Sequence, residues 1–148
     1  MEGVRVFIKM NNGDIDFERG NVIRIFYVDN NHIVSVHGVV IEKLNKFITV
    51  VYLTNDIKHS DKRLPIIEVE NNTYRVTPIL FYVFRDFYKY VDVVTTLDKD
   101  MLELIKLTIE QPTDNLSYRI KRFYKKEIDK YLMSFYDMMI SSVVKNDI

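Results

Sequence analysis

The chain has 148 residues, of which 47% are hydrophobic, and its 21 basic and 21 acidic side chains give a formal net charge of zero. This length and apolar content predict one folded domain, residues 1–148, while the balanced charge excludes a global field that would attract nucleic acid or an anionic membrane. The lack of cysteine excludes disulfides, thiolate metal sites and thiol catalysis.

The composition also bears on origin and compartment. Alanine and tryptophan do not occur, whereas Ile, Asn, Lys and Tyr, whose codons are rich in A and T, are common. We interpret this as the product of an AT-rich genome, such as that of a large DNA virus or a low-GC cell. The most apolar window, 79–94, is interrupted by four charged residues, and the start of the chain is unlike a signal peptide. We therefore expect a cytoplasmic protein that does not enter membranes.

Residues 4–76 have the two-residue periodicity and the turn signals of a mostly antiparallel sheet. We expect turns at 29–31, at 45–46 and around Asn71-Asn72, and a bend or bulge at Gly38. The pattern predicts about seven short strands, near 4–10, 14–18, 21–28, 33–44 (divided at Gly38), 47–53, 64–69 and 73–76.

The first two strands are predicted to form a hairpin. Asn12-Gly13 is a strong signal for a tight type I′ turn between strands. In the register that this turn imposes, Lys9 would face Asp16, and apolar residues would face apolar residues.

After residue 76 the apolar pattern changes to a helical period. The helices are expected near 78–91, 97–110 and 115–143. Thr77 suits the cap of the first helix, Thr95 a capping box before the second, and Asp114 the cap of the third. Strands followed by helices predict an α+β fold, with the helices covering one face of the sheet.

Residues able to support catalysis or metal binding are few and poorly spaced. Three carboxylates alternate along the second predicted strand, at 14, 16 and 18, as expected for the solvent side of an edge hairpin. The three histidines do not have the spacing of metal ligands. No nucleophile elbow or glycine-rich phosphate loop occurs, so we expect no catalytic residue, metal or cofactor, although acid–base catalysis by ordinary carboxylates stays open. The residues considered are Asp14, Asp16, Glu18, His32, His37 and His59.

Six aromatic residues lie between positions 81 and 90. On a helix over 78–91, most of them would pack on the sheet as core. Tyr82, Arg85 and Lys89 would lie on the opposite face, where we expect an interaction patch.

The segment 118–126 is the most unusual of the chain, with five cations and three aromatics in nine residues. A helix start prefers acidic residues and like charges at i,i+4 repel, so this segment departs from helix preferences in the way that functional sites do. The simpler alternative is a solvated face whose cations pair with acids elsewhere. The candidate residues for partner or nucleic-acid binding are Tyr118, Arg119, Lys121, Arg122, Lys125 and Lys126.

Within this segment the aromatic side chains are expected to divide between two roles. Tyr118 and Tyr124 would stack on bases if the cations contacted phosphates. Phe123 and Ile120 lie on the apolar stripe of the helix and are expected in the core.

Two segments resemble parts of BTB adaptor folds of the elongin C type: the opening hairpin over 11–17 and the strand–helix segment from Leu64 to Val91. The resemblance implies an adaptor for other proteins. The β-rich stretch 21–53 departs from the family pattern, in which a helix follows the first hairpin.

These observations lead to two hypotheses besides the adaptor. The first is a non-enzymatic module for protein–protein interaction, assembly or self-association that uses the aromatic and C-terminal helices, where Met133, Met138 and Met139 offer an adaptable apolar surface. The second is nucleic-acid binding by the basic and aromatic helix face over 118–126.

Overall fold

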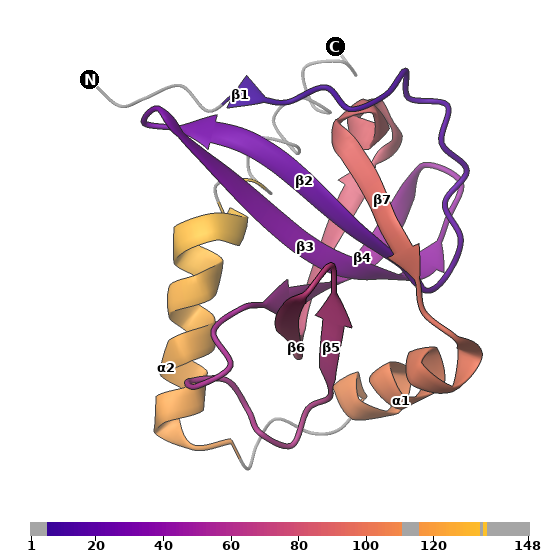
Figure 1. Cartoon of the computed structure of the whole chain (residues 1–148). Helices are drawn as coiled ribbons and strands as arrows, with labels where there is room; N and C mark the ends of the chain where they lie inside the picture. The colour runs from indigo at the N-terminus through magenta and orange to yellow at the C-terminus, as the bar shows by residue number, and fades with distance from the viewer. Residues whose placement is uncertain (1–5, 111–115, 134, 136–148) are drawn as a thin grey trace.

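A computed structural model describes residues 6–110, 116–133 and 135, and shows a sheet of seven strands with helical segments around it (Figure 1). Every strand pair is antiparallel, so the predicted α+β class is confirmed. The strands are β1 (Val6–Phe7), β2 (Asn21–Asp29), β3 (His32–Lys43), β4 (Phe47–Thr54), β5 (Ile66–Val69), β6 (Asn72–Phe84) and β7 (Val91–Thr96). The helical segments are the 3₁₀-helix η1 (Arg85–Tyr90), α1 (Lys99–Ile109), α2 (Tyr118–Glu127) and the π-helical turn η2 (Ile128–Leu132).

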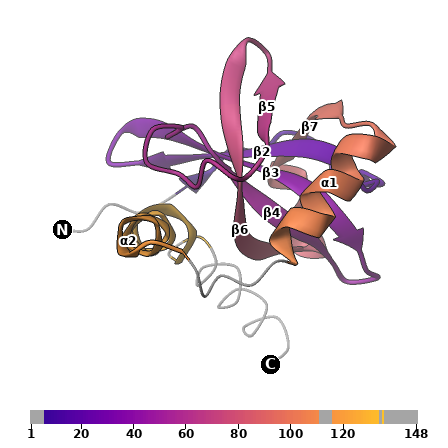
Figure 2. The same ribbon diagram turned by 90° about the horizontal axis from the view of Figure 1, so that it is seen from below.

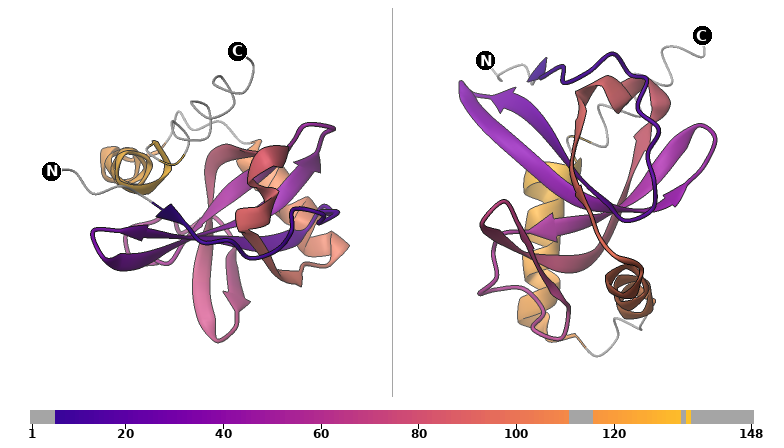
Figure 3. Two further views of the ribbon diagram at one scale, coloured as in Figure 1. Left: turned by 90° about the horizontal axis from the view of Figure 1, so that it is seen from above. Right: turned by 45° about the vertical axis from the view of Figure 1, so that its right-hand side comes forward.

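The strands follow the order β1-β2-β3-β4-β6-β5, and β7 also pairs with β2. Strands β7 and β1 occupy the same side of β2, because β7 pairs with residues 21–25 and β1 with residues 27–28. Figure 3 shows η1 at the point where the chain leaves β6 and turns back into β7. This connection places the last strand, β7, beside the first long strand, β2.

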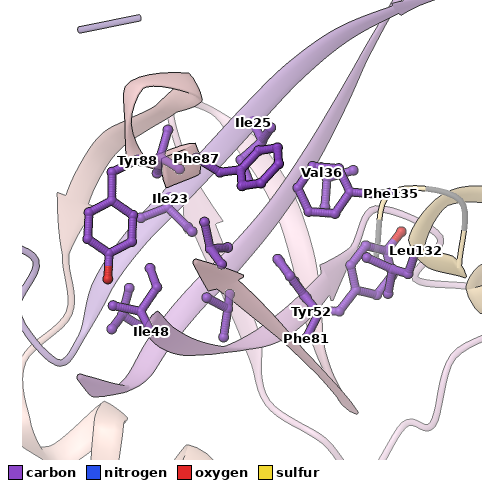
Figure 4. Packing of buried hydrophobic residues seen from close by; sticks show 14 of the residues in the cluster. Ile23, Ile25, Val36, Ile48, Tyr52, Phe81, Phe87, Tyr88, Leu132 and Phe135 are labelled. Atoms are coloured by element: carbon purple, nitrogen blue, oxygen red, sulfur yellow. The ribbon is translucent and has the colours of Figure 1, made fainter. Parts of the chain in front are cut away.

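The sheet is buried on both faces at its central strand β4. Seven of the eight positions of β4 are buried, and their side chains alternate between two apolar clusters. The first cluster includes residues of η1 together with Leu132 and Phe135 (Figure 4), and the second contains Ile105 of α1. Figure 2 shows α1 and α2 well apart, with strands between them. The prediction that helices cover one face is therefore wrong, because both faces of the central strands are apolar and need a cover.

The predicted first hairpin does not form, and residues 8–20 contain no strand. Asn11 instead joins this segment to the end of η1, since its side-chain amide donates to the carbonyls of Tyr88 at 3.1 Å and Val91 at 2.7 Å. Its carbonyl oxygen accepts the Gly13 N–H at 2.6 Å, a local turn in which Gly13 has a φ of 91°. Asp16 pairs with Lys43 rather than with Lys9. Long-range hydrogen bonds thus override the local turn signal.

The predicted helix over 78–91 is also wrong. Strand β6 continues to Phe84, with Phe81 paired to Val50 and Val83 to Ile48 of β4, and only residues 85–90 turn helically, as η1. The apolar residues of this segment satisfy a period of two as well as a period of 3.6, and periodicity cannot separate these for a short apolar run. Residues 78–84 form a strand because they pair with the buried strand β4.

Two hairpins agree with the sequence. Asn30 and Asn31 connect β2 to β3 with φ values of 51° and 67°, the left-handed pair that a type I′ turn requires. The turn between β5 and β6 has its positive φ values at Glu70 and Asn71, one residue before the predicted position. Gly38 does not interrupt β3; the irregularity in the pairing of β3 with β4 lies between Val40 and Glu42.

The two α-helices form close to the predicted positions but with different caps. Asp98 rather than Thr95 caps α1, accepting the Met101 N–H at 2.8 Å. Ser117 caps α2, accepting the Ile120 N–H at 3.3 Å, and the predicted cap Asp114 lies outside the described residues, as do positions 136–143 of the predicted third helix. Among the helices that the structure describes, none has the length and apolar character needed to cross a membrane.

Candidate functional site

Helix α2 buries one side and turns its positive charges outward. Phe123 and Tyr124 are buried, and Leu132 and Phe135 continue this side into the first cluster. The expected core position of Phe123 is confirmed, whereas Ile120 is half-buried. The exposed cations of the helix are Arg119, Lys121, Arg122, Lys125 and Lys126.

These five cations have no carboxylate partner in the part of the chain that the structure describes. The salt bridges found there join Arg24 to Asp92 and Glu70, and others join Lys43, His59 and Arg63 to acids near them. The simpler interpretation of 118–126, a face neutralised by acids from elsewhere in the fold, is thus not what residues 6–110 and 116–133 show. Within these residues, the five cations of α2 are exposed and make no salt bridge.

The loop over 55–65, between β4 and β5, runs beside α2 (Figure 1). Two depressions lie between the loop and the helix. The larger, of about 810 Å³, is lined by Asp56 and His59 of the loop and by one side of α2. The smaller, of about 460 Å³, is lined by residues 58–63 and by residues 116–120. Loop and helix therefore form one continuous surface.

The loop adds cations that the sequence did not single out, because residues 54–63 have no periodicity and look like an ordinary polar loop. Lys58, Lys62 and Arg63 line the smaller depression together with Arg119. Arg119 also lines the larger depression. We call this set the basic surface; its cations are Lys58, Lys62, Arg63, Arg119, Arg122, Lys125, Lys126 and Lys130.

An ion pair between buried Asp61 and exposed Arg63 holds the loop in shape. Asp61 is buried and accepts hydrogen bonds from the backbone and guanidinium of Arg63, which lowers the pKa of the Asp61 carboxyl. Arg75 of β6 is buried beneath the loop and donates to the Leu64 carbonyl at 2.7 Å and to the Lys62 carbonyl at 3.3 Å. These bonds fix the backbone that carries the loop cations.

The structure separates the predicted residues of 118–126 into groups. Arg119, Arg122, Lys125 and Lys126 line the larger depression together. Lys121 and Tyr118 are exposed but line neither depression, Tyr118 with 79% of its surface accessible. Tyr124, expected to stack on bases, is buried and cannot do so, since its ring is covered by the fold.

The interaction patch predicted for Tyr82, Arg85 and Lys89 required a helix over 78–91, and that helix does not form. Tyr82 lies on β6 with its ring edge-on to Phe47 at 5.3 Å, whereas Arg85 and Lys89 belong to η1. The Lys89 carbonyl accepts the Met10 N–H at 2.7 Å, so its backbone holds the N-terminal segment. No common helix face brings these three residues together.

A polar pocket that the sequence did not indicate lies between the sheet and the far end of α2. It has a volume of about 670 Å³. Tyr52 donates a hydrogen bond from its hydroxyl to Glu127 Oε2 at 2.7 Å, tying β4 to α2. We call it the tyrosine pocket; its lining includes Ser35, His37, Tyr52, Asn55, Asp56, Tyr74, Glu127, Lys130 and Tyr131.

His37 and Tyr74 form one wall of the tyrosine pocket. Their rings are 4.6 Å apart between centroids, and His37 Nε2 is 3.2 Å from the Tyr74 hydroxyl. Burial, and secondarily the positive charge of Arg24, lowers the pKa of His37 to about 4. This histidine is therefore neutral at pH 7, and sequence offered no signal for the pairing because its partner is 37 residues away.

The structure gives no support for a metal centre in the segments that it describes. No group of three or more His, Asp or Glu side chains there could hold an ion. Asp16 pairs with Lys43, and His59 Nδ1 lies 3.0 Å from Asp56 Oδ1. His32 is exposed at the start of β3.

No protein family, curated protein or solved structure is detectably similar to this chain. The resemblance to BTB adaptors depended on a hairpin over 11–17 and a helix within 64–91. The hairpin does not form, and the helix is reduced to the six-residue η1, so the fold carries little of that resemblance.

Proposed function

We propose that the protein is a non-enzymatic binding module whose basic surface takes the phosphate backbone of a single-stranded nucleic acid. The observation that carries the proposal is the row of exposed Arg119, Arg122, Lys125 and Lys126, which make no salt bridge among the described residues. The row follows a depression that the carboxylates Asp56, Glu127 and Asp129 also line, and the loop over 55–65 extends it with further cations. Phosphate contacts by lysine and arginine supply most of the affinity in binding that does not depend on sequence.

Two features favour a single strand over a duplex. Eight of the 21 lysines and arginines of this neutral chain line the two adjoining depressions, which suits a groove that follows one backbone. Tyr118, with 79% of its surface accessible at the start of α2, offers a ring on which an unpaired base can stack.

The test is charge reversal measured as salt dependence. We expect Arg122→Glu combined with Lys126→Glu to abolish binding of a fluorescent single-stranded oligonucleotide at moderate salt. Either substitution alone should reduce the slope of log affinity against log salt by roughly 0.7 for each phosphate that the protein no longer neutralises. Fluorescence anisotropy titrations between about 50 and 200 mM salt measure this slope.

Lys121→Glu is the matched control. It changes the charge of the same helix by the same amount, one residue away from Arg122, but lines neither depression. Equal losses for Lys121→Glu and Arg122→Glu would contradict a located phosphate site and leave only general attraction. The double variant should also keep the stability of the wild type within about 0.5 kcal/mol, because both side chains are exposed and the new pair of like charges at i,i+4 replaces the old one. A marked loss of stability would mean that these cations are structural partners.

Protein–protein interaction is the second candidate. Helix α1 places Ile105 in the second cluster, yet Leu104 and Leu107 have 47% and 60% of their surface accessible. Exposed leucines one turn apart suit an apolar contact with another protein or a second copy. Light scattering after size exclusion tests this candidate: an oligomer that Leu104→Glu with Leu107→Glu converts to a monomer supports it, and a strict monomer counts against self-association.

A further inference from the structure

The tyrosine pocket adjoins the basic surface. Its wall and the wall of the larger depression share Asp56, Glu127 and Lys130, so the two hollows lie on either side of the same side chains. A ligand whose phosphate lies on α2 can therefore extend another part into the tyrosine pocket without leaving the protein surface.

The lining of the tyrosine pocket suits a flat ligand. Tyr52, Tyr74 and Tyr131 contribute aromatic rings from β4, β6 and η2, and the His37 ring is neutral. Tyr52 and Tyr74 are buried, whereas Tyr131 is half-buried and has Lys130 Nζ 4.9 Å from its ring centroid, so a base would stack on Tyr131 beside or in place of this cation. Aromatic side chains of this kind hold nucleobases by their π-faces.

The tyrosine pocket has two carboxylate acceptors, Asp56 and Glu127, beside the donor Lys130 and side chains that can both donate and accept. Glu127 receives the Tyr52 hydroxyl on Oε2, and within the described residues no donor bonds its other carboxylate oxygen. The Asp56 carboxylate and the Asn55 amide lie at the same rim. Carboxylate oxygens accept N–H groups and so favour a base that carries an exocyclic amino group.

Tyr131 lies in the π-helical turn η2. Helix α2 ends at Glu127, and η2 adds one wider turn over 128–132 before Leu132 and Phe135 enter the first cluster. Such turns are rare and concentrate at functional sites, because they change the direction of the side chains that follow.

From this juxtaposition we infer that the tyrosine pocket binds the base of an unpaired nucleotide whose phosphates lie on the basic surface, with preference for bases bearing an amino group. The base stacks on Tyr131, and its amino group donates to Glu127. This inference rests on the proposed nucleic-acid function and adds to it a site for base contact, so the tests below separate the two.

The first test compares Tyr131→Ala with the wild type on an oligonucleotide and on an abasic strand of equal length. We expect roughly tenfold weaker binding of the base-bearing strand, the effect of removing one base–aromatic stack, with an unchanged salt slope and no effect on the abasic strand. Met133→Ala, exposed two residues further along, is the control and should leave both affinities unchanged. If Tyr131→Ala weakens both strands equally, or neither, no base occupies the pocket, while the phosphate proposal stands.

The second test uses uncharged ligands and the wild-type protein, so it depends neither on the variant folding nor on phosphate contacts. Cytidine should shift the NMR signals of the His37 and Tyr74 rings, and uridine, which replaces the amino group by a carbonyl, should shift them less at equal concentration. No shift with either nucleoside would overturn the pocket inference, and equal shifts would overturn the amino preference. If oligonucleotides fail to bind but cytidine binds, the proposed function fails and the pocket remains a site for a free base or nucleoside.

Discussion

Gly38 lies in the middle of β3 where the neighbouring strand β4 approaches too closely for a side chain. A Cβ atom built on Gly38 would be 2.3 Å from Val50 Cγ1 and 2.8 Å from the Val51 carbonyl oxygen. Both valines are fully buried, so neither can move away without disturbing the core. At this single residue, the packing of two strands depends on the absence of a methyl group.

We therefore expect Gly38→Ala to destabilise the protein by about 3 kcal/mol, at the upper end of the usual cost of overpacking a core. Urea denaturation followed by circular dichroism measures the change. Ser35→Ala, at an exposed position of the same strand, is the control and should change the free energy of unfolding by less than about 0.5 kcal/mol. An unaltered midpoint for Gly38→Ala would show that β3 and β4 are farther apart than this packing requires.

At the scale of elements, two nearby residues, Thr95 and Asp98, are candidates for the N-cap of α1. Sequence pointed to Thr95 through the spacing of a capping box, but Thr95 is still part of β7. The Asp98 carboxylate accepts the Met101 N–H and also carries the negative charge that a helix start favours.

Asp98→Ala should therefore reduce stability by about 1 kcal/mol, the usual effect of removing an N-cap. Thr95→Ala, at an exposed position three residues earlier, should cost less than about 0.5 kcal/mol. Chemical denaturation of the two variants side by side tests the assignment. Equal losses, or a larger loss at Thr95, would place the cap where the sequence pattern put it.

For the whole molecule, His37 links the stability of the fold to pH. Burial holds the pKa of His37 near 4, below its ordinary value of 6.5, so between these values the unfolded chain binds more protons than the folded one. Stability then rises with pH across this interval and is lost as the pH falls from about 6.5 towards 4.

His37→Gln should flatten this dependence. We expect the free energy of unfolding of the variant to change less than that of the wild type between pH 6.5 and about pH 4, because glutamine does not titrate. Urea denaturation at a series of pH values gives both curves. If the two curves run parallel, His37 titrates normally in the folded protein and its ring is more hydrated than the pairing with Tyr74 implies.

The sequence predicts an element correctly where the interactions that stabilise it join residues close together in the chain. The turn at Asn30-Asn31 was predictable, because two left-handed residues and alternating strands specify a hairpin within a few positions. The Asn12-Gly13 signal was equally strong but failed, because Asn11 found backbone acceptors about 80 residues away. The helix over 78–91 failed because pairing with β4, some 30 residues distant in sequence, outweighed the helical stripe.

The same division applies to the candidate site. By itself, the sequence determined the α+β class, the concentration of cations over 118–126 and the buried position of Phe123, since these depend on composition and short-range period. Tertiary structure alone decided which cations act together, because the loop over 55–65 has no periodic pattern and meets α2 only in the fold. It also created the tyrosine pocket, whose groups come from β3, β4, the loop over 55–65, β6, the end of α2 and η2. Contacts between segments so far apart leave no mark on local sequence.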